Sequence, residues 1–161
     1  MRSRKERTFL IITFCGHSEI FGEEGLKEKL SATIEENARG EVTFYLGGYG
    51  TFDGMALCAC REYKAAHPSA RIVFVTPYLD EEYLKNRDFR LRDYDEILFP
   101  EIEKTPLKYA IIKRNEWMVR QANLVIAFVD HSWGGAAKTL EYAVKHRIAY
   151  VNLGKKVFFT E

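Results

Sequence analysis

The stretch Leu124-Val125-Ile126-Ala127-Phe128-Val129 decides the fold. It is apolar without interruption, whereas a strand with one face in solvent alternates between apolar and polar residues. Such continuous runs are typical of strands that are buried on both faces, as in parallel sheets covered by helices. The run ends at Asp130-His131, and a glycine-containing turn then leads into a helical pattern. The stretch therefore predicts an inner strand of a parallel sheet, followed by a helix.

The rest of the chain repeats this alternation of apolar runs and helical patterns. The six predicted strands are Thr8–Cys15, Val42–Leu46, Arg71–Thr76, Glu96–Phe99, Asn123–Val129 and Ala149–Leu153. Apolar residues at helical spacing predict four helices, with inward residues Leu26, Leu30, Ile34 and Ala38; Met55, Ala59, Tyr63 and Ala66; Leu107, Ile111 and Met118; and Ala137, Leu140 and Val144. Thr105 is the expected cap of the third helix, with Pro106 in its first turn, and the segment Tyr83 to Asp93 is expected to form a short helix and a surface loop. The order of elements predicts an α/β fold, a doubly wound and mainly parallel sheet of about six strands with helices on both faces.

Composition narrows the class of protein. The chain has 161 residues, 47% of them hydrophobic, which suffices for a core and argues against disorder. No apolar run is long enough to cross a membrane, so we expect a cytoplasmic protein without a membrane partner. We expect a single domain over residues 1–161, with a basic tip at 1–7 and a tail at 154–161 that forms an extra strand or a contact in a homo-oligomer.

Charge and cysteine usage argue against two further classes. The chain carries 24 Lys and Arg against 23 Asp and Glu, which argues against nucleic acid as the main partner. Single-stranded nucleic acid, held by Arg87, Arg90 and Arg92, is a third hypothesis for function. The three cysteines, Cys15, Cys58 and Cys60, have the number and spacing of core residues rather than of a disulfide framework or a metal site. We therefore expect no metal and no cofactor.

Ligands of open parallel sheets bind beyond the carboxyl ends of the strands. Two of the loops expected there are rich in glycine, and both lead into helices. Glycine lets backbone N–H groups approach a phosphate, and the helix start adds its positive dipole, although tight turns alone also require glycine. The residues predicted to bind a ligand in the loops at this edge are Gly16 and His17; Gly47, Gly48, Gly50 and Asp53; and Asp130, Gly134, Gly135 and Ala136.

A cation interrupts the apolar stripe of the third predicted helix. Arg114 lies three residues after Ile111 and four before Met118, and Asn115 flanks the same face. A guanidinium that faces the sheet needs partners, because an unpaired buried charge is costly. Those partners are either a carboxylate of the protein, from Asp53, Asp130 or Glu141, or a phosphate or carboxylate of a ligand.

Three other side chains leave two interpretations open. His17 and His131 either contact a ligand or act as acid and base, or they are ordinary loop histidines. Glu141 either pairs with Lys145 four residues on, or reaches a ligand at the turn that contains Gly134. No residue spacing in the sequence indicates a metal site.

Three segments resemble the SLOG superfamily, Rossmann-like domains related to the cytokinin-activating phosphoribohydrolases and to DNA-processing Rossmann proteins. Gly47-Gly48 through Phe52-Asp53 resembles its glycine and Phe-Asp loop, and Arg114-Asn115-Glu116-Trp117-Met118-Val119 resembles its Arg-Asn-x-x-Met-Val helix. The stretch from Val129-Asp130 through Gly134-Gly135 to Tyr142-Ala143 resembles its last phosphate loop and helix. The resemblance extends from Phe9 to Leu153 and is to an uncharacterised, stand-alone branch of the superfamily.

The resemblance implies a Rossmann-like domain that binds a nucleotide or a nucleotide-derived small molecule, as a sensor or binding module. Phosphate would lie on the two glycine-rich loops, Arg114 would hold its charge, and Asn115 would bind sugar or loop backbone. The alternative is an enzyme, a nucleoside monophosphate N-glycosidase of the phosphoribohydrolase type, in which Arg114 fixes the phosphate and Glu141 or Asp53 acts at the sugar.

Overall fold

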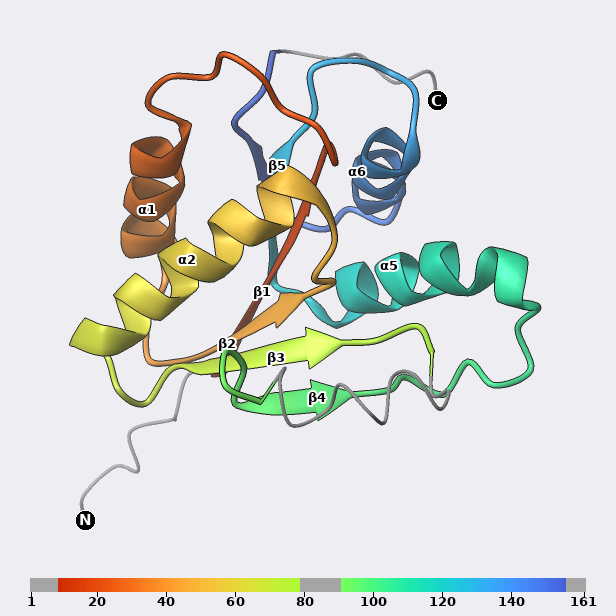
Figure 1. Ribbon diagram of the computed structural model, residues 1–161, viewed down its shortest axis with the longest axis horizontal. Coiled ribbons are helices and arrows are strands. Elements are labelled where there is room, and N and C mark those ends of the chain that lie inside the picture. Colours follow the sequence, from red (N-terminus) through yellow and green to blue (C-terminus); the bar gives the residue numbers. More distant parts are fainter. Residues whose placement is uncertain (1–8, 79–90, 156–161) are drawn as a thin grey trace.

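The computed structural model describes residues 9–78 and 91–155, in which strands and helices alternate (Figure 1). The strands are β1 (Phe9–Gly16), β2 (Glu41–Leu46), β3 (Arg71–Val75), β4 (Glu96–Leu98), β5 (Leu124–Phe128) and β6 (Tyr150–Asn152). The helices are α1 (Leu26–Asn37), α2 (Gly50–Ala66), α5 (Ala110–Gln121) and α6 (Gly135–Lys145), with a short 3-10 helix, η1 (Leu107–Tyr109), ahead of α5. Each strand coincides with one of the predicted apolar runs to within one or two residues.

The sheet has six strands in the order β4-β3-β2-β1-β5-β6, and every neighbouring pair is parallel. The first four strands extend from β1 toward one edge of the sheet, whereas β5 and β6 extend from β1 toward the other. The direction of winding therefore reverses between β1 and β5, and a crevice at the carboxyl ends of two such strands is where doubly wound sheets bind ligands. The predicted fold class is confirmed.

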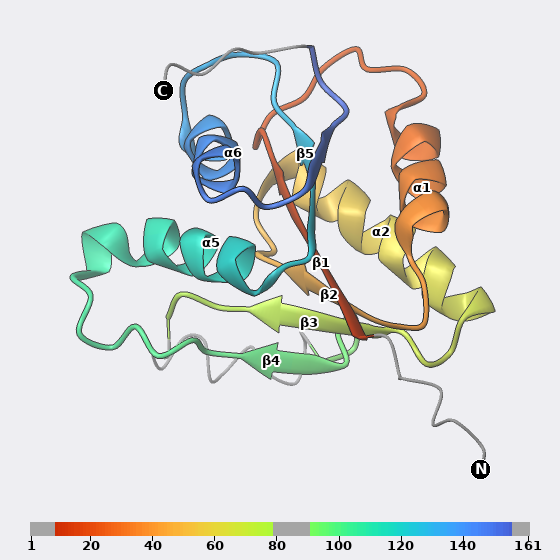
Figure 2. The same ribbon diagram turned by 180° about the vertical axis from the view of Figure 1, so that it is seen from behind.

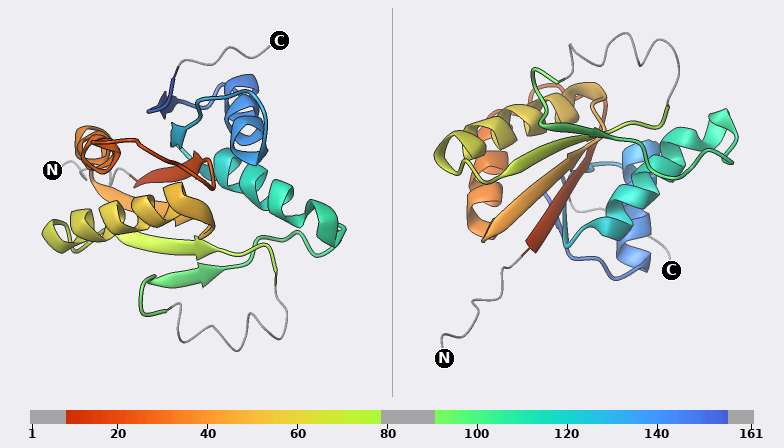
Figure 3. Two further views of the ribbon diagram at one scale, coloured as in Figure 1. Left: turned by 45° about the horizontal axis from the view of Figure 1, so that its top comes forward. Right: turned by 90° about the horizontal axis from the view of Figure 1, so that it is seen from below.

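The two faces of the sheet pack against different helices, as Figures 1 and 2 show from opposite sides. One face contributes Ile12, Phe44, Ile72 and Ile126, which pack with residues of α1 and α2. The other face contributes Val125 and Ala127, which pack with α6, and Val73 and Val75, which pack with Met118 of α5. The continuous apolar runs thus supply both cores, with alternate residues on each side. Figure 3 shows α5 and α6 side by side at the carboxyl end of β1.

Helix α5 differs from its prediction in where it begins and in the face that it buries. Pro106 precedes η1 rather than an α-helical turn, and Leu107 is 77% exposed and Ile111 47% exposed. Of the predicted inward stripe only Met118 is in the core; the buried residues are Ala110, Arg114, Met118 and Val119. The tighter winding of a 3-10 turn explains part of this, because it takes Leu107 off the face that the following α-helix buries.

Three smaller predictions are wrong. Ala66, predicted to face inward, is exposed at the end of α2. Val144 is 37% exposed, and Ala143 takes the buried place on α6, because Ala137, Leu140 and Ala143 follow one another at three-residue spacing. Cys58 is exposed on α2, whereas Cys15 and Cys60 are buried as expected.

Several expectations lie outside the described residues: the basic tip at 1–7, all but the last three residues of the segment from Tyr83 to Asp93, and the tail beyond residue 155. Within the ranges 9–78 and 91–155, no helix combines the length and the apolar character needed to cross a membrane.

Candidate functional site

A cavity of about 420 Å3 lies at the carboxyl end of β1, with α5 and the start of α6 among its walls. Eight of the predicted site residues line it: Gly16, His17, Asp53, Arg114, Asn115, Gly134, Gly135 and Ala136. Gly47, Gly48, Gly50, Asp130 and Glu141 are not among the described residues that form its wall. The structure thus brings together residues from the ends of β1 and β5 and from α2 and α5.

Arg114 is buried, with 4% of its surface exposed, and it extends from α5 toward the ends of β2 and β3. Its Nη1 donates hydrogen bonds to the carbonyl oxygens of Gly47 and Val75, at 3.0 and 2.9 Å. Its Nε donates to Oδ1 of Asn115 at 2.9 Å, which fixes the plane of the guanidinium. Nη2 carries none of these three bonds, and the side chain lines the cavity. The prediction that Arg114 is buried and faces the loops is therefore confirmed.

The carboxylates proposed to pair with Arg114 have other positions. Asp130 lies against His17, and Glu141 binds Lys145 at 3.3 Å on α6. Asp53 attracts the guanidinium electrostatically without a direct ion pair among the described residues. Arg114 is therefore satisfied mainly by main-chain carbonyls, and its positive charge is offset only at longer range.

Asp53, in the first turn of α2, is a carboxyl group on the wall of the cavity. It accepts a hydrogen bond from the N–H of Tyr49 at 3.2 Å. Burial raises the pKa of Asp53 to about 6, while the Tyr49 N–H and the charge of Arg114 act in the opposite direction. A carboxyl group with a pKa near neutrality, facing a cavity, can exchange a proton with a ligand.

Packing accounts for the glycines after β2. A side chain at Gly47 would meet the guanidinium of Arg114 at 3.0 Å, and one at Gly48 would meet the ring of Phe74 at 2.3 Å. Gly48 also has φ +71°, a conformation that L side chains rarely adopt. These glycines admit Arg114 to the ends of the strands, and the part of this loop that reaches the cavity is Tyr49. A direct role of Gly47, Gly48 and Gly50 in binding remains a prediction.

The start of α6 presents main-chain amides to the cavity. Gly134 precedes the helix with φ +94° and no side-chain cap, and the first hydrogen bond of the helix is from the Lys138 N–H to the Gly134 carbonyl at 3.1 Å. The amides before Lys138 therefore have no partner within the helix, as at every helix start. Gly135 and Ala136 line the cavity at this point. Such a site favours anions, because the amides and the helix dipole both present positive charge.

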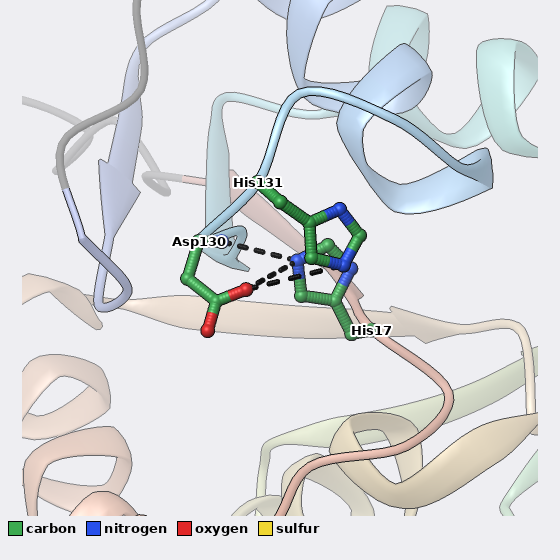
Figure 4. A group of neighbouring side chains, drawn as sticks. All are labelled: His17, Asp130 and His131. Carbon is green, nitrogen blue, oxygen red and sulfur yellow. Dashed lines mark hydrogen bonds and ion pairs between the residues drawn. The ribbon is translucent and has the colours of Figure 1, made fainter.

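Two loop histidines and an aspartate meet where the winding of the sheet reverses (Figure 4). His17 follows β1 and is buried, and its Nε2 accepts a hydrogen bond from the N–H of Asp130 at 3.0 Å. Oδ1 of Asp130 also lies 3.0 Å from that nitrogen. The ring of His131 stacks on His17 at 3.7 Å between centroids, and Trp133 stacks on the other side of His131 at 3.8 Å. Burial and the neighbouring His131 lower the pKa of His17, while the carboxylate of Asp130 acts in the opposite direction.

Sequence reasoning missed several residues of the cavity wall, among them Ser18, Tyr49, Ile111 and Thr139. Ile111 is predicted as a core residue, and its apolar side chain faces the cavity instead. Tyr49 and Ser18 lie inside the loops that the sequence identified, so position in the loop was the available signal. Thr139 lies one turn into α6, where its hydroxyl donates to the Gly135 carbonyl at 2.8 Å.

No protein-family model matches the chain. An uncharacterized SPbeta prophage-derived protein of Bacillus subtilis, YoqJ, is 29% identical over 140 residues, which cover 74% of this chain and 81% of that protein. This relative is similar along most of its length but carries no assigned activity in its name.

Solved structures with the same fold are more distant in sequence. The DNA processing protein A of Helicobacter pylori, whose structure describes a single-stranded DNA binding mode, superposes with a TM-score of 0.61 at 15% identity, covering 92% of this chain and 66% of that one. The Streptococcus pneumoniae DNA processing protein A gives 0.59 at 16% identity and covers 89% and 50%. The molybdenum cofactor carrier protein of Chlamydomonas reinhardtii gives 0.55 at 14% identity and covers 90% and 76%.

This chain thus spans half to two thirds of the DNA processing proteins, and at these identities the likeness concerns the fold. The order of strands, the helices on both faces and these neighbours agree with the motifs in the sequence. The chain has a Rossmann-like fold.

Proposed function

We propose that this protein binds a nucleotide or a nucleotide-derived small molecule in the cavity at the carboxyl end of β1, as a sensor or binding module. The observation that carries the proposal is that one cavity is lined both by the buried guanidinium of Arg114 and by the first residues of α6, Gly135 and Ala136. A guanidinium and a set of free helix amides are the two protein groups best suited to a phosphate.

The rest of the cavity suits an organic group attached to that phosphate. Its volume of about 420 Å3 is within the usual range for small-molecule sites, which is roughly 300–1,000 Å3. Ile111 and Met118 of α5 provide an apolar wall, and Tyr49 adds an aromatic ring that is 76% exposed. Such surfaces pack against a base or another flat ring. The molybdenum cofactor carrier protein, one of the fold neighbours, supports the idea that this fold can hold a small molecule.

The test uses two substitutions of Gly135, where a Cβ would meet open space. Thermal unfolding of the wild-type protein is followed with inorganic phosphate, with each nucleoside monophosphate and with a single-stranded DNA oligonucleotide. A ligand at about 100 times its Kd stabilises the folded state by about 2.7 kcal/mol. We expect at least one monophosphate to stabilise the protein more than inorganic phosphate does.

Gly135→Asp places a carboxylate at the start of α6, where it favours the helix but repels a phosphate. Gly135→Asn is the matched neutral control. We expect the aspartate variant to remain folded and to lose the ligand-induced stabilisation, while the asparagine variant retains most of it. Equal binding by both variants, or no response to any monophosphate, would contradict the proposal. Stabilisation by the oligonucleotide alone would move the function toward single-stranded nucleic acid.

A second candidate is the N-glycosidase, and the position of Asp53 is the observation in its favour. The carboxyl group of Asp53 lines the cavity with a pKa of about 6, so it can act on a water molecule or on the leaving base. Glu141, the other predicted catalytic carboxylate, pairs with Lys145 and is not among the described residues of the cavity wall. The assay measures slow release of free base from a nucleoside monophosphate. Release that is lost in Asp53→Asn and kept in Glu141→Gln would support the enzyme. Binding without release would support the sensor.

A further inference from the structure

The cluster of His17, Asp130 and His131 has a geometry that phosphate binding leaves unexplained (Figure 4). The three residues come from the ends of β1 and β5, which are neighbouring strands, although 113 positions separate His17 from Asp130 in the sequence. Each residue offers one ligand atom, and the three atoms lie within 4.8 Å of one another. The spacing of these residues along the sequence does not indicate a metal site, because this grouping exists only in the folded chain.

The contact between His17 and Asp130 brings two electron-rich atoms together. The main-chain N–H of Asp130 donates to Nε2 of His17 at 3.0 Å, so this nitrogen bears a lone pair rather than a proton. The carboxylate oxygen Oδ1 of Asp130 lies 3.0 Å from the same nitrogen. A cation that binds both atoms would take the lone pair that the Asp130 N–H now occupies, and it would offset the repulsion between the two acceptors.

His131 supplies a third donor on the same side. Its Nε2 is 4.0 Å from Oδ1 of Asp130, and its ring lies parallel to that of His17, with 11° between the planes. Ligand atoms around a tetrahedral cation at bond lengths of about 2.0–2.1 Å are roughly 3.3 Å apart, so the present spacings are close to those required. The lone pair of each Nε2 lies in the plane of its own ring, so two stacked parallel rings cannot direct both lone pairs at one cation, and the ring of His131 must turn toward His17 to complete the set. Its side chain is 27% exposed against 9% for His17, and it lies on a surface loop.

The identity of the three donors limits the cation. Two imidazole nitrogens and one carboxylate oxygen suit Zn2+ and similar first-row divalent ions, whereas Mg2+ and Ca2+ prefer sets made of oxygen alone. His131 Nδ1 is also buried and has no hydrogen-bond partner in the described part of the chain. Because Nδ1 makes no hydrogen bond to the described residues, no such bond holds the ring of His131 in its present orientation.

We propose that Nε2 of His17, Oδ1 of Asp130 and Nε2 of His131 form a binding site for a first-row divalent cation such as Zn2+. His17 and His131 both line the cavity, so the free coordination position of a three-ligand site would be available to a ligand bound there. The site is independent of the proposed nucleotide, because the three donors all come from the protein.

The test measures binding of Zn2+ alone, by isothermal titration calorimetry, to tag-free protein that carries Cys58→Ser. This substitution removes an exposed thiol that would bind zinc elsewhere. We expect one equivalent of Zn2+ to bind with at least about a hundredfold preference over Mg2+.

Asp130→Asn keeps the shape of the side chain and the main-chain bond to His17, and His131→Ala alters a surface loop. We expect each to weaken Zn2+ binding by at least about tenfold, by loss of one ligand.

His146→Ala is the matched control, because His146 is an exposed histidine whose ring stacks on Tyr142 at 3.9 Å, away from the cluster. It should bind Zn2+ like the parent protein. Circular dichroism confirms that each variant is folded, and absorption bands of bound Co2+ report whether the donors include nitrogen. The proposal is overturned if the parent binds no Zn2+, if Asp130→Asn and His131→Ala bind it unchanged, or if His146→Ala loses it equally. Failure of every nucleotide to bind would leave these outcomes unaffected.

Discussion

Arg114 forms no direct ion pair in the described part of the chain, and its partners are the carbonyl oxygens of Gly47 and Val75. The sequence predicted that this cation would be buried, because it interrupts an apolar stripe. It could not predict that the carbonyl groups after two different strands would be the partners, since these come together only when β2 and β3 pair. A Cβ at position 47 would lie 3.0 Å from Cζ of Arg114. A glycine that is predicted to bind phosphate therefore also makes room for the arginine.

The first prediction concerns removal of this guanidinium. Arg114→Ala removes a charged donor from two main-chain carbonyls, and a hydrogen bond to a charged group contributes about 1.5–3 kcal/mol. We expect the free energy of unfolding, measured with urea, to fall by about 2–4 kcal/mol. Arg114→Lys should recover only part of this loss, because one ammonium cannot reproduce the planar fork. Lys113→Ala, which removes an exposed partner of Glu116, is the control and should change stability by less than about 1 kcal/mol. A loss no larger than that of the control would show that the arginine is not structural.

Asp53 makes a second prediction at the same scale. Its pKa is about 6 in the folded protein against 3.8 as the ordinary value, so the folded state holds the proton more tightly. The contribution of Asp53 to stability is therefore greatest below the lower value and declines as the pH rises through the higher one. Asp53→Asn removes that decline. Its free energy of unfolding, relative to wild type, should rise between about pH 4 and about pH 6.5 and stay level above.

The comparison uses urea titrations of the wild-type protein and of Asp53→Asn across this pH range. The difference between their free energies of unfolding is plotted against pH. The difference is used because other groups titrate equally in both proteins. A difference that stays constant would mean that folding leaves the pKa of Asp53 unchanged, and one that falls with rising pH would mean that the carboxyl group is stabilised in its ionised form.

At the scale of elements, the strands were easier to predict than the faces of the helices. In an α/β fold, a short continuous apolar run is typical of a strand that is buried on both faces. The runs around Leu124 and Thr8 therefore predicted β5 and β1. A helix has several partly apolar faces, and the choice between them depends on neighbours that the sequence does not show. Leu107 and Ile111 were assigned to the core for this reason, yet Leu107 precedes the α-helix and Ile111 faces the cavity. On α6, Ala143 rather than Val144 packs inward.

Glu141 on α6 provides the prediction at this scale. Its carboxylate binds Lys145 at 3.3 Å, one turn further along the helix, and both side chains are partly exposed. Pairs of this kind contribute about 0.2–0.5 kcal/mol. Glu141→Gln should therefore lower the free energy of unfolding by less than about 0.5 kcal/mol and leave nucleotide binding nearly intact. Calorimetric titration with the monophosphate that stabilises the wild type best measures this. A tenfold or greater loss of affinity would place Glu141 at the ligand.

At the scale of the whole molecule, the order of the strands determines which loops meet. Because β5 pairs with β1 on the side away from β2, the loops after β1 and β5 lie together where the winding reverses. Applied to the sequence, the rule that ligands bind beyond the carboxyl ends of the strands selected several loops, among them the loops after β1 and β5. The rule does not give the composition of the cavity wall, which depends on how far each loop extends. It could not show that His17, Asp130 and His131 meet in three dimensions.

The last prediction is that a bound ligand slows amide hydrogen exchange in the loops around the first cavity and leaves the exchange of other amides unchanged. A second cavity, of about 390 Å3, lies on the α2 side and includes Arg61, Lys64 and Arg92 in its wall, so an anion has another candidate position. Arg61 and Lys64 are already paired with Asp93 and Asp95, which offsets their attraction for an anion. Hydrogen exchange with and without the best monophosphate should therefore slow at residues 16–19, 49–53 and 134–139. Amides around residues 61–64 and 91–95 should exchange at unchanged rates, whereas protection confined to them would move the binding site to the second cavity.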